Sequence, residues 1–131
     1  EQLDDASHAF PRIDDRRTGL SYRYGWGVAP RPGAPDGMGS PTVIAKWDLR
    51  DGSRTWHDIG ATSTTGEPVF VPASESAGED EGWLVTFLHD AATDRSTFVV
   101  LDARDMAAPP VATVELPQRV PHGFHGSWLA D

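Results

Sequence analysis

Short apolar runs separated by glycines, prolines and polar clusters dominate the pattern of this 131-residue chain. Its 13 glycines and 11 prolines are spread along the whole length, which leaves little room for the long apolar stripe of an amphipathic helix. The runs between them are rich in β-branched and aromatic residues, which favour strands. The pattern therefore predicts an all-β chain with almost no helix.

Six segments have the composition expected of strands. They are Thr42–Leu49, Arg54–Ile59, Glu67–Pro72, Gly82–Asp90, Ser96–Ala103 and Val111–Leu116. The pair Asp51-Gly52 suits a hairpin turn, and the polar stretch 90–95 can connect another pair of strands, so antiparallel neighbours are expected. Residues 25–41, including a Gly-Trp-Gly sequence, and residues 73–82 are expected to form longer loops.

The order of these segments suggests an internal repeat. Short segments beginning at Ala9, Glu67 and His125 start 58 residues apart, and similar strands follow the first two in the same order. Repeated four-stranded units are typical of β-propeller blades, whose period is about 40–50 residues and longer with loop insertions. We predict blade-like units over about residues 9–60 and 67–120 and a closing strand over 124–129, with a small β-sandwich as the alternative. In a propeller the segment starts would face the central axis.

Composition narrows the class of protein. The formal charge of -9 disfavours nucleic acid or an anionic membrane as a partner, and the absence of cysteine excludes disulfides and thiolate metal sites. No apolar run approaches the roughly 20 residues of a membrane span. We expect a soluble, cytoplasmic protein, or one that associates with a membrane through sequence outside this chain. The first residue is Glu1 rather than Met, which suits a processed or partial sequence.

Histidines are the candidate metal ligands. The chain has five, His8, His57, His89, His122 and His125. Their spacing contains no HExxH or His-x-His pattern, so the chain does not specify a complete zinc or iron site. His125 is the strongest candidate ligand, against the ordinary alternative of a structural or exposed histidine. Residues three apart in a strand face opposite sides, so at most one of His122 and His125 is expected at the axis.

Carboxylate and hydroxyl side chains provide fewer candidate functional residues. Glu67 precedes a buried-looking strand, where it would need a partner such as a histidine N–H, unless it is an exposed residue at the strand start. The acidic run Glu79–Glu81 is interpreted as a solvated loop. Ser127 lies near His125 but outside any GxSxG elbow, so nucleophilic catalysis has little support. Four tryptophans are expected in packing roles: Trp47, Trp56, Trp83 and Trp128.

An ordered set of motifs resembles the carotenoid oxygenase family, which includes carotenoid, apocarotenoid and stilbene cleavage enzymes and the retinoid isomerohydrolase. The motifs are FPRID from Phe10, YRYGWG from Tyr22, GEPVFVP from Gly66, DEGWLVTFLHD after the acidic loop, LDARDM from Leu101 and VELPQRVPHGFHGSW from Val114. The resemblance covers nearly the whole chain. It implies the C-terminal part of a seven-bladed β-propeller, with about two four-stranded antiparallel blades plus the first strand of the closing blade.

The resemblance also implies a metal site. His125 in GFHGSW matches the last of four histidines that hold a non-haem iron, Fe(II) or Fe²⁺, and the other three would lie in the remaining N-terminal part of the propeller. Glu67 matches a glutamate that orients another ligand histidine. Ala9 stands where the family pattern EFPRI has a second such glutamate, and losing such a partner costs roughly 10- to 100-fold in metal affinity or activity.

The implied reaction is oxidative cleavage of a conjugated C=C bond in a carotenoid, apocarotenoid or stilbene, with O2 as co-substrate and two carbonyl products. Phe124 and Trp128 would lie near an apolar substrate tunnel or serve in packing. The isolated chain is expected to be inactive. A non-catalytic propeller fragment and a β-sandwich interaction module are the alternatives.

Overall fold

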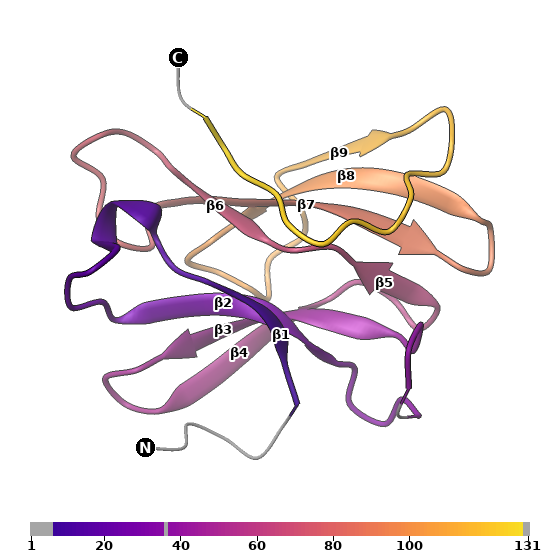
Figure 1. The fold of residues 1–131 in the computed structure, drawn as a ribbon, viewed down its shortest axis with the longest axis horizontal. Helices are drawn as coiled ribbons and strands as arrows, with labels where there is room; N and C mark the ends of the chain where they lie inside the picture. The colour runs from indigo at the N-terminus through magenta and orange to yellow at the C-terminus, as the bar shows by residue number, and fades with distance from the viewer. Residues whose placement is uncertain (1–6, 36, 130–131) are drawn as a thin grey trace.

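Two antiparallel β-sheets make up the fold in the computed structural model, which describes residues 7–35 and 37–129 (Figure 1). The first sheet has the strand order β1-β2-β3-β4. Its strands are β1 (Ala9–Arg12), β2 (Tyr24–Pro30), β3 (Thr42–Asp48) and β4 (Ser53–Asp58). One short 3₁₀ helix, η1 (Asp15–Arg17), follows β1 and is the only helical turn among the described residues.

The second sheet repeats this order and adds a strand. Its members are β5 (Ser63–Thr65), β6 (Val69–Pro72), β7 (Gly82–Asp90), β8 (Arg95–Asp102) and β9 (Ala112–Glu115). Strands β6, β7, β8 and β9 are neighbours in chain order, as in the first sheet, while β5 pairs with the other end of β7. The all-β prediction is confirmed, and the two sheets are consistent with part of a β-propeller.

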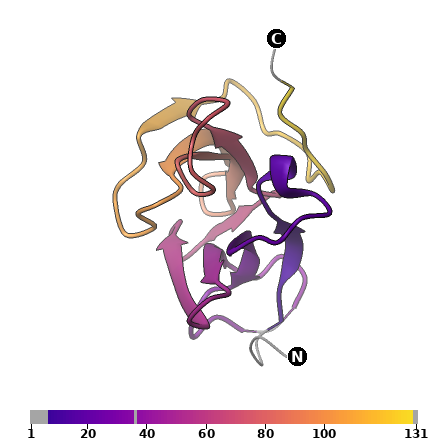
Figure 2. The same cartoon turned by 90° about the vertical axis from the view of Figure 1, so that its left-hand side faces the viewer.

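The shared apolar core lies between the sheets. Trp26 and Ile44 from the first sheet pack with Phe70, Leu84 and Leu101 from the second, all at most 5% exposed. The rings of Trp26 and Phe70 are stacked, with centroids 4.8 Å apart and an interplanar angle of 5°. Burial of apolar area on this scale is the main favourable term in folding. The two sheets therefore stabilise one another (Figure 2).

The N-terminal part of the segment predicted as a long loop is a strand instead. Residues Tyr24–Pro30 form β2, which pairs along its full length with β3. Glycine disfavours a strand interior, but a Cβ on Gly27 would lie only 3.0 Å from the carbonyl oxygen of Ala9 in β1. The glycine therefore permits close approach of the β1 backbone, and the prediction of a loop over residues 25–30 was wrong. The three-residue β5 was also missed, because Ser-Thr-Thr carries no apolar signal.

The segment predicted as a closing strand, 124–129, forms no strand among the described residues. A strand requires a neighbouring strand to accept and donate its backbone hydrogen bonds. The segment instead runs past β6, where a Cβ on Gly126 would lie 3.5 Å from Val69 (Figure 1). This crossing brings Gly126 next to the start of β6.

Two residues of the acidic run, Glu79 and Asp80, join the two sheets, whereas Glu81 is exposed. The side chain of Glu79 accepts hydrogen bonds from the backbone N–H groups of Arg23 and Tyr24 in the first-sheet region. The ammonium group of Lys46, which is 7% exposed, donates to Asp80 at 2.6 Å. A buried lysine requires a partner, so the prediction of a solvated loop was wrong for Glu79 and Asp80.

Arg16 holds the other end of the same loop. Its guanidinium contacts the buried carboxylate of Asp14 at 2.7 Å and also donates to the carbonyl oxygens of Ser74 and Glu75. Loop 73–82 is therefore fixed at both ends to the region around β1 and β2.

The tryptophans divide between core and surface. Trp47 is buried, as is Trp26, but Trp56, Trp83 and Trp128 are between 37% and 53% exposed, so their predicted packing role is not seen within the described residues. Trp56 and Trp83 lie on strands, where alternate side chains point away from the core. No helix within residues 7–35 and 37–129 has the length and apolar character needed to cross a bilayer.

Candidate functional site

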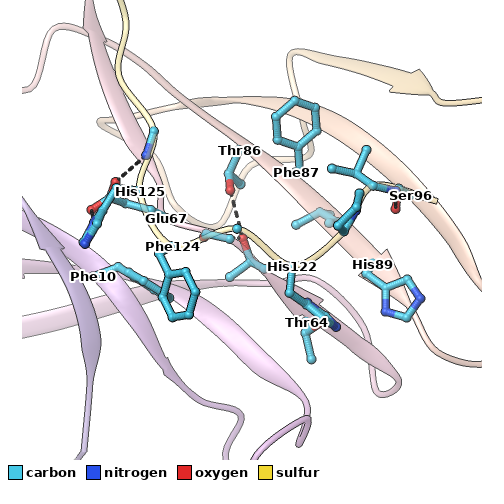
Figure 3. Close-up of a pocket in the computed structure, with 17 residues that line it drawn as sticks. Phe10, Thr64, Glu67, Thr86, Phe87, His89, Ser96, His122, Phe124 and His125 are labelled. Carbon is cyan, nitrogen blue, oxygen red and sulfur yellow. Dashed lines mark hydrogen bonds and ion pairs between the residues drawn. The ribbon is translucent and has the colours of Figure 1, made fainter. Parts of the chain in front are cut away.

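A pocket of about 380 Å³ lies between the second sheet and the C-terminal segment (Figure 3). Five parts of the chain line it: Phe10 in β1, residues 64–67, residues 86–89, Ser96 and residues 120–126. Glu67 and His125 lie at one end, whereas His89 and His122 lie at the other (Figure 3). The wall between them includes the apolar side chains of Phe87 and Phe124.

Glu67 occupies a break in the edge of the second sheet. Strands β5 and β6 pair with successive parts of β7, and residues 66–68 lie between them. The N–H of Gly66 still donates to the carbonyl oxygen of Phe87 at 3.0 Å, but Pro68 has no N–H to continue the ladder. The sequence Gly-Glu-Pro therefore interrupts the edge strand at the residue that faces the C-terminal segment.

The Glu67 carboxylate binds the C-terminal segment through both of its oxygens. Oε1 lies 3.3 Å from Nδ1 of His125, and Oε2 accepts the backbone N–H of Gly126 at 2.8 Å. The Glu67 side chain is 4% exposed and the His125 side chain 78% exposed. A neutral imidazole that donates Nδ1–H to a carboxylate keeps the lone pair of Nε2 for another partner, which is the usual arrangement around a metal-bound histidine.

Phe10 also contacts the His125 ring. The two rings meet edge to face with centroids 6.0 Å apart. Phe10 has a positive φ of 54°, an uncommon conformation for a bulky residue. Ala9, next to it, is exposed and has no polar side chain to contribute. Of the three repeat positions, the structure thus brings Glu67 and His125 into contact.

His122 lines the same pocket as His125 but lies at its other end (Figure 3). The opposite-face argument assumed a strand, and the described segment has no strand geometry there. The ring of His122 meets that of His89 edge to face at 5.5 Å. His89 Nε2 lies 3.0 Å from the carboxylate of Asp94 and accepts from Arg119 at 3.3 Å.

The other predicted candidates lie elsewhere. The His8 ring packs on Trp47, and His57 Nδ1 is 3.3 Å from the carbonyl oxygen of Met106. Ser127 does not line the pocket. Within residues 7–35 and 37–129, no three or more His, Cys, Asp or Glu side chains are grouped so that they could hold a metal ion.

Sequence reasoning missed Arg12, whose guanidinium donates to the carbonyl oxygen of Gly126 at 3.3 Å and lies 3.6 Å from Glu67. Its contacts join residues 114 positions apart, so no local pattern signals them. Phe10 was noticed only as part of a motif. A hint was available in the 58-residue spacing, which predicts that Phe10 and Arg12 lie beside the axis position.

Comparison with known proteins now defines the class to which this fold and site belong. The model of the family described as retinal pigment epithelial membrane protein matches residues 1–130. The crystal structure of Pseudomonas brassicacearum lignostilbene dioxygenase is similar over 100% of this chain and 29% of that chain, with a TM-score of 0.91 and 32% identity. The fold is thus that of a segment of a carotenoid oxygenase.

Sequence relatives agree with the structural match. The apocarotenoid-15,15'-oxygenase of Synechocystis sp. is 36% identical over 119 residues, which cover 91% of this chain and 24% of that protein. The carotenoid 9,10(9',10')-cleavage dioxygenase 1 of Arabidopsis thaliana is 37% identical, covering 93% of this chain and 24% of that protein. The chain belongs to the carotenoid oxygenase family and spans about a quarter of the length of these relatives.

Proposed function

We propose that this chain is the C-terminal part of a non-haem Fe(II)-dependent dioxygenase. The complete protein would use O2 to cleave a conjugated C=C bond of a carotenoid, apocarotenoid or stilbene. Membership of a family whose named relatives act on apocarotenoids, carotenoids and lignostilbene supports this class of substrate. The observation that carries the proposal is the contact between Glu67 and His125 at the pocket end.

The residues present fit one ligand of an iron site together with the carboxylate that orients it. An imidazole is a suitable ligand for Fe(II), and a carboxylate at its Nδ1 fixes both the orientation of the ring and the proton position that leaves Nε2 free. His125 is the one ligand that we assign in this chain. Three further histidines would come from sequence outside these 131 residues.

The iron, when bound, would supply the site at which O2 is activated for cleavage of the double bond. The residues of this chain would orient the ligand histidine and the substrate. Glu67 would hold the proton on Nδ1 of His125, and Phe10 would limit rotation of its ring. Phe124 and Phe87 would offer apolar surface to a polyene or stilbene.

The alanine at position 9 would weaken the complete site relative to a protein with a glutamate there. A missing carboxylate partner leaves a ligand histidine with fewer constraints on its orientation, and such losses typically cost about 10- to 100-fold in metal affinity or activity. Activity of the parent protein would therefore depend more strongly on the Glu67–His125 contact.

Two histidine variants of the full-length protein test the proposal, with iron content and cleavage of an apocarotenoid and of a stilbene as the measurements. His125→Ala should lose at least about 10-fold in iron affinity, and product formation should fall with it. His122→Ala is the matched control, three residues away in the same pocket, and should keep its iron. A His125→Ala protein with wild-type iron content and turnover would contradict the ligand assignment.

A second candidate function, a non-catalytic interaction module, draws on the exposed apolar face of the second sheet. Phe87, Val114 and Trp83 are each more than a third exposed on β7 and β9. We expect the 131-residue chain to associate through this face, so light scattering should show an average mass that rises with concentration. A cleanly monomeric chain that unfolds cooperatively would favour a self-contained β-sandwich instead.

A further inference from the structure

We propose that Arg12 is a positioning residue that holds His125 in place through Glu67 and the backbone of Gly126. This inference rests on the proposed role of His125 as an iron ligand. It adds a cationic residue from the first sheet to a site that already takes Phe10 from that sheet, Glu67 from the second sheet and His125 from the C-terminal segment.

A β-bulge brings Arg12 to the site. In the pairing of β1 with β2, Ala9 lies opposite Val28 and Arg12 opposite Trp26, so three steps along β1 match two along β2. The irregular residue is Phe10, with its positive φ of 54°. Such a conformation costs of order 1–3 kcal/mol and persists where the surrounding structure over-determines it. Here it accompanies the placement of both the Phe10 ring and the Arg12 side chain against the C-terminal segment.

The contacts of Arg12 close a ring of interactions around Gly126. Nη1 of Arg12 donates to the Gly126 carbonyl oxygen at 3.3 Å and lies 3.6 Å from Oε2 of Glu67. The same Oε2 accepts the Gly126 N–H at 2.8 Å. Both backbone polar groups of the residue after His125 are therefore held, one by the carboxylate and one by the guanidinium.

Burial makes the ion pair more than a surface contact. The Glu67 side chain is 4% exposed and that of Arg12 is 18% exposed, so solvent screens their attraction only weakly. A carboxylate with so little access to water is costly without a cation nearby. Loss of the guanidinium would favour any movement that carries the Glu67 carboxylate toward solvent and away from Nδ1 of His125.

Arginine suits this position better than lysine because the guanidinium has two usable ends. While Nη1 lies against Gly126 and Glu67, Nη2 donates to Asp15 at 3.0 Å. Asp15 is the first residue of η1, three positions after Arg12, and this second contact fixes the orientation of the guanidinium. A lysine ammonium keeps the positive charge but has a single nitrogen. It therefore cannot bind Asp15 on one side and Gly126 and Glu67 on the other with the same geometry.

The need for such a clamp follows from the setting of His125. Its side chain is 78% exposed, and residues 124–129 form no strand among the described residues. Glu67 and Phe10 both contact the ring, and Glu67 is in turn held by Arg12. Orientation of the imidazole therefore depends on Arg12 although the two side chains need not touch.

The test uses the full-length protein loaded with Fe(II) and measures the rate at which a chelator removes the iron, together with kcat and KM. Arg12→Gln should release iron about 10-fold faster or more, with a lower kcat and a nearly unchanged KM, since Arg12 does not line the pocket. Arg12→Lys should release iron at a rate between those of the wild type and Arg12→Gln. Arg31→Gln is the matched control, because it breaks an arginine–aspartate pair, with Asp58 at 3.0 Å, that does not line the pocket.

Wild-type iron release and kcat in Arg12→Gln would overturn the inference. Should that variant fail to fold, Arg12→Lys decides, and a release rate equal to that of the wild type would overturn it. A wild-type protein that binds no iron would instead refute the proposed function. In that case amide hydrogen exchange at Gly126 still tests the clamp: faster exchange in Arg12→Gln than in Arg31→Gln supports it, and equal exchange overturns it.

Discussion

The two sheets share a strand order but differ in what covers them. In the first sheet, β3 is buried on both faces, because every residue from Val43 to Trp47 is buried. In the second, β7 alternates at its start, with Leu84 and Thr86 buried but Trp83 and Phe87 exposed. Both strands are rich in apolar residues, so composition does not distinguish them. The comparison teaches that similar strands acquire different surroundings from the elements packed against them.

The inner edges of the sheets differ as well. The first sheet begins at Ala9 and contributes Phe10 and Arg12 to the pocket end through a bulge. The second is interrupted at Glu67, which contributes a carboxylate. The corresponding edge strands thus have complementary roles, since the cation and the aromatic ring come from one sheet and the anion from the other.

The largest effect is expected from removing a side chain of the core between the sheets. Leu84→Ala should lower the free energy of unfolding by about 2–5 kcal/mol, because Leu84 is fully buried against residues of both sheets. Urea denaturation of the full-length protein, followed by tryptophan fluorescence, measures this change. Val114→Ala, on the exposed face of the same sheet, is the control and should change stability by less than about 0.5 kcal/mol. Equal effects would mean that the face bearing Val114 is as well covered as the core.

A smaller effect is expected from cutting the acidic connection between the sheets. Glu79→Ala leaves the backbone N–H groups of Arg23 and Tyr24 without their carboxylate acceptor, which should cost about 1–3 kcal/mol. The same denaturation measurement applies. Glu75→Ala changes an exposed side chain of the same loop and should be nearly neutral. If both variants behave alike, the loop does not couple the sheets.

The smallest expected effect is the loss of stability at acidic pH. Hydrogen bonds from Arg23 and Arg31 lower the pKa of Asp48 and Asp58 in the first sheet, whereas the hydroxyls of Thr62 and Thr93 lower that of Asp90 in the second. A lowered carboxyl pKa contributes stability that is present above the unfolded-state value of about 3.9 and is lost as pH falls through the folded-state value. Stability should therefore decline below about pH 4.

The salt dependence of this acid effect separates the sheets. The Arg31–Asp58 pair is exposed and screened. Arg31→Gln in 1 M salt should therefore remove little further stability, while in low salt it should flatten the loss of stability between pH 5 and pH 3. Thr62→Val should reduce the pH dependence of stability by the same amount at both salt concentrations, because the hydrogen bond from Thr62 to Asp90 involves no cation. Urea midpoints at each pH measure both. A flattening by Arg31→Gln that persists in high salt would contradict the ionic account.

Much of the fold was predictable because it follows from local pattern. Apolar runs of β-branched and aromatic residues gave the positions of β3, β4 and β6 to β9, and the 58-residue spacing predicted the repeated strand order. Local pattern failed where the backbone of another strand decides, as at Gly27 in β2. It failed again at the acidic run, whose partners Arg23 and Lys46 are distant in sequence.

The sequence by itself determined the all-β class, the family resemblance and the selection of Glu67 and His125 as candidate site residues. Only the tertiary structure decided that these two touch, that both ends of the pocket contain a histidine from the C-terminal segment, and that Arg12 lies against Glu67. The reason is physical: strand propensity depends on a few neighbouring residues, whereas an ion pair between residues 12 and 67 depends on how the two sheets pack.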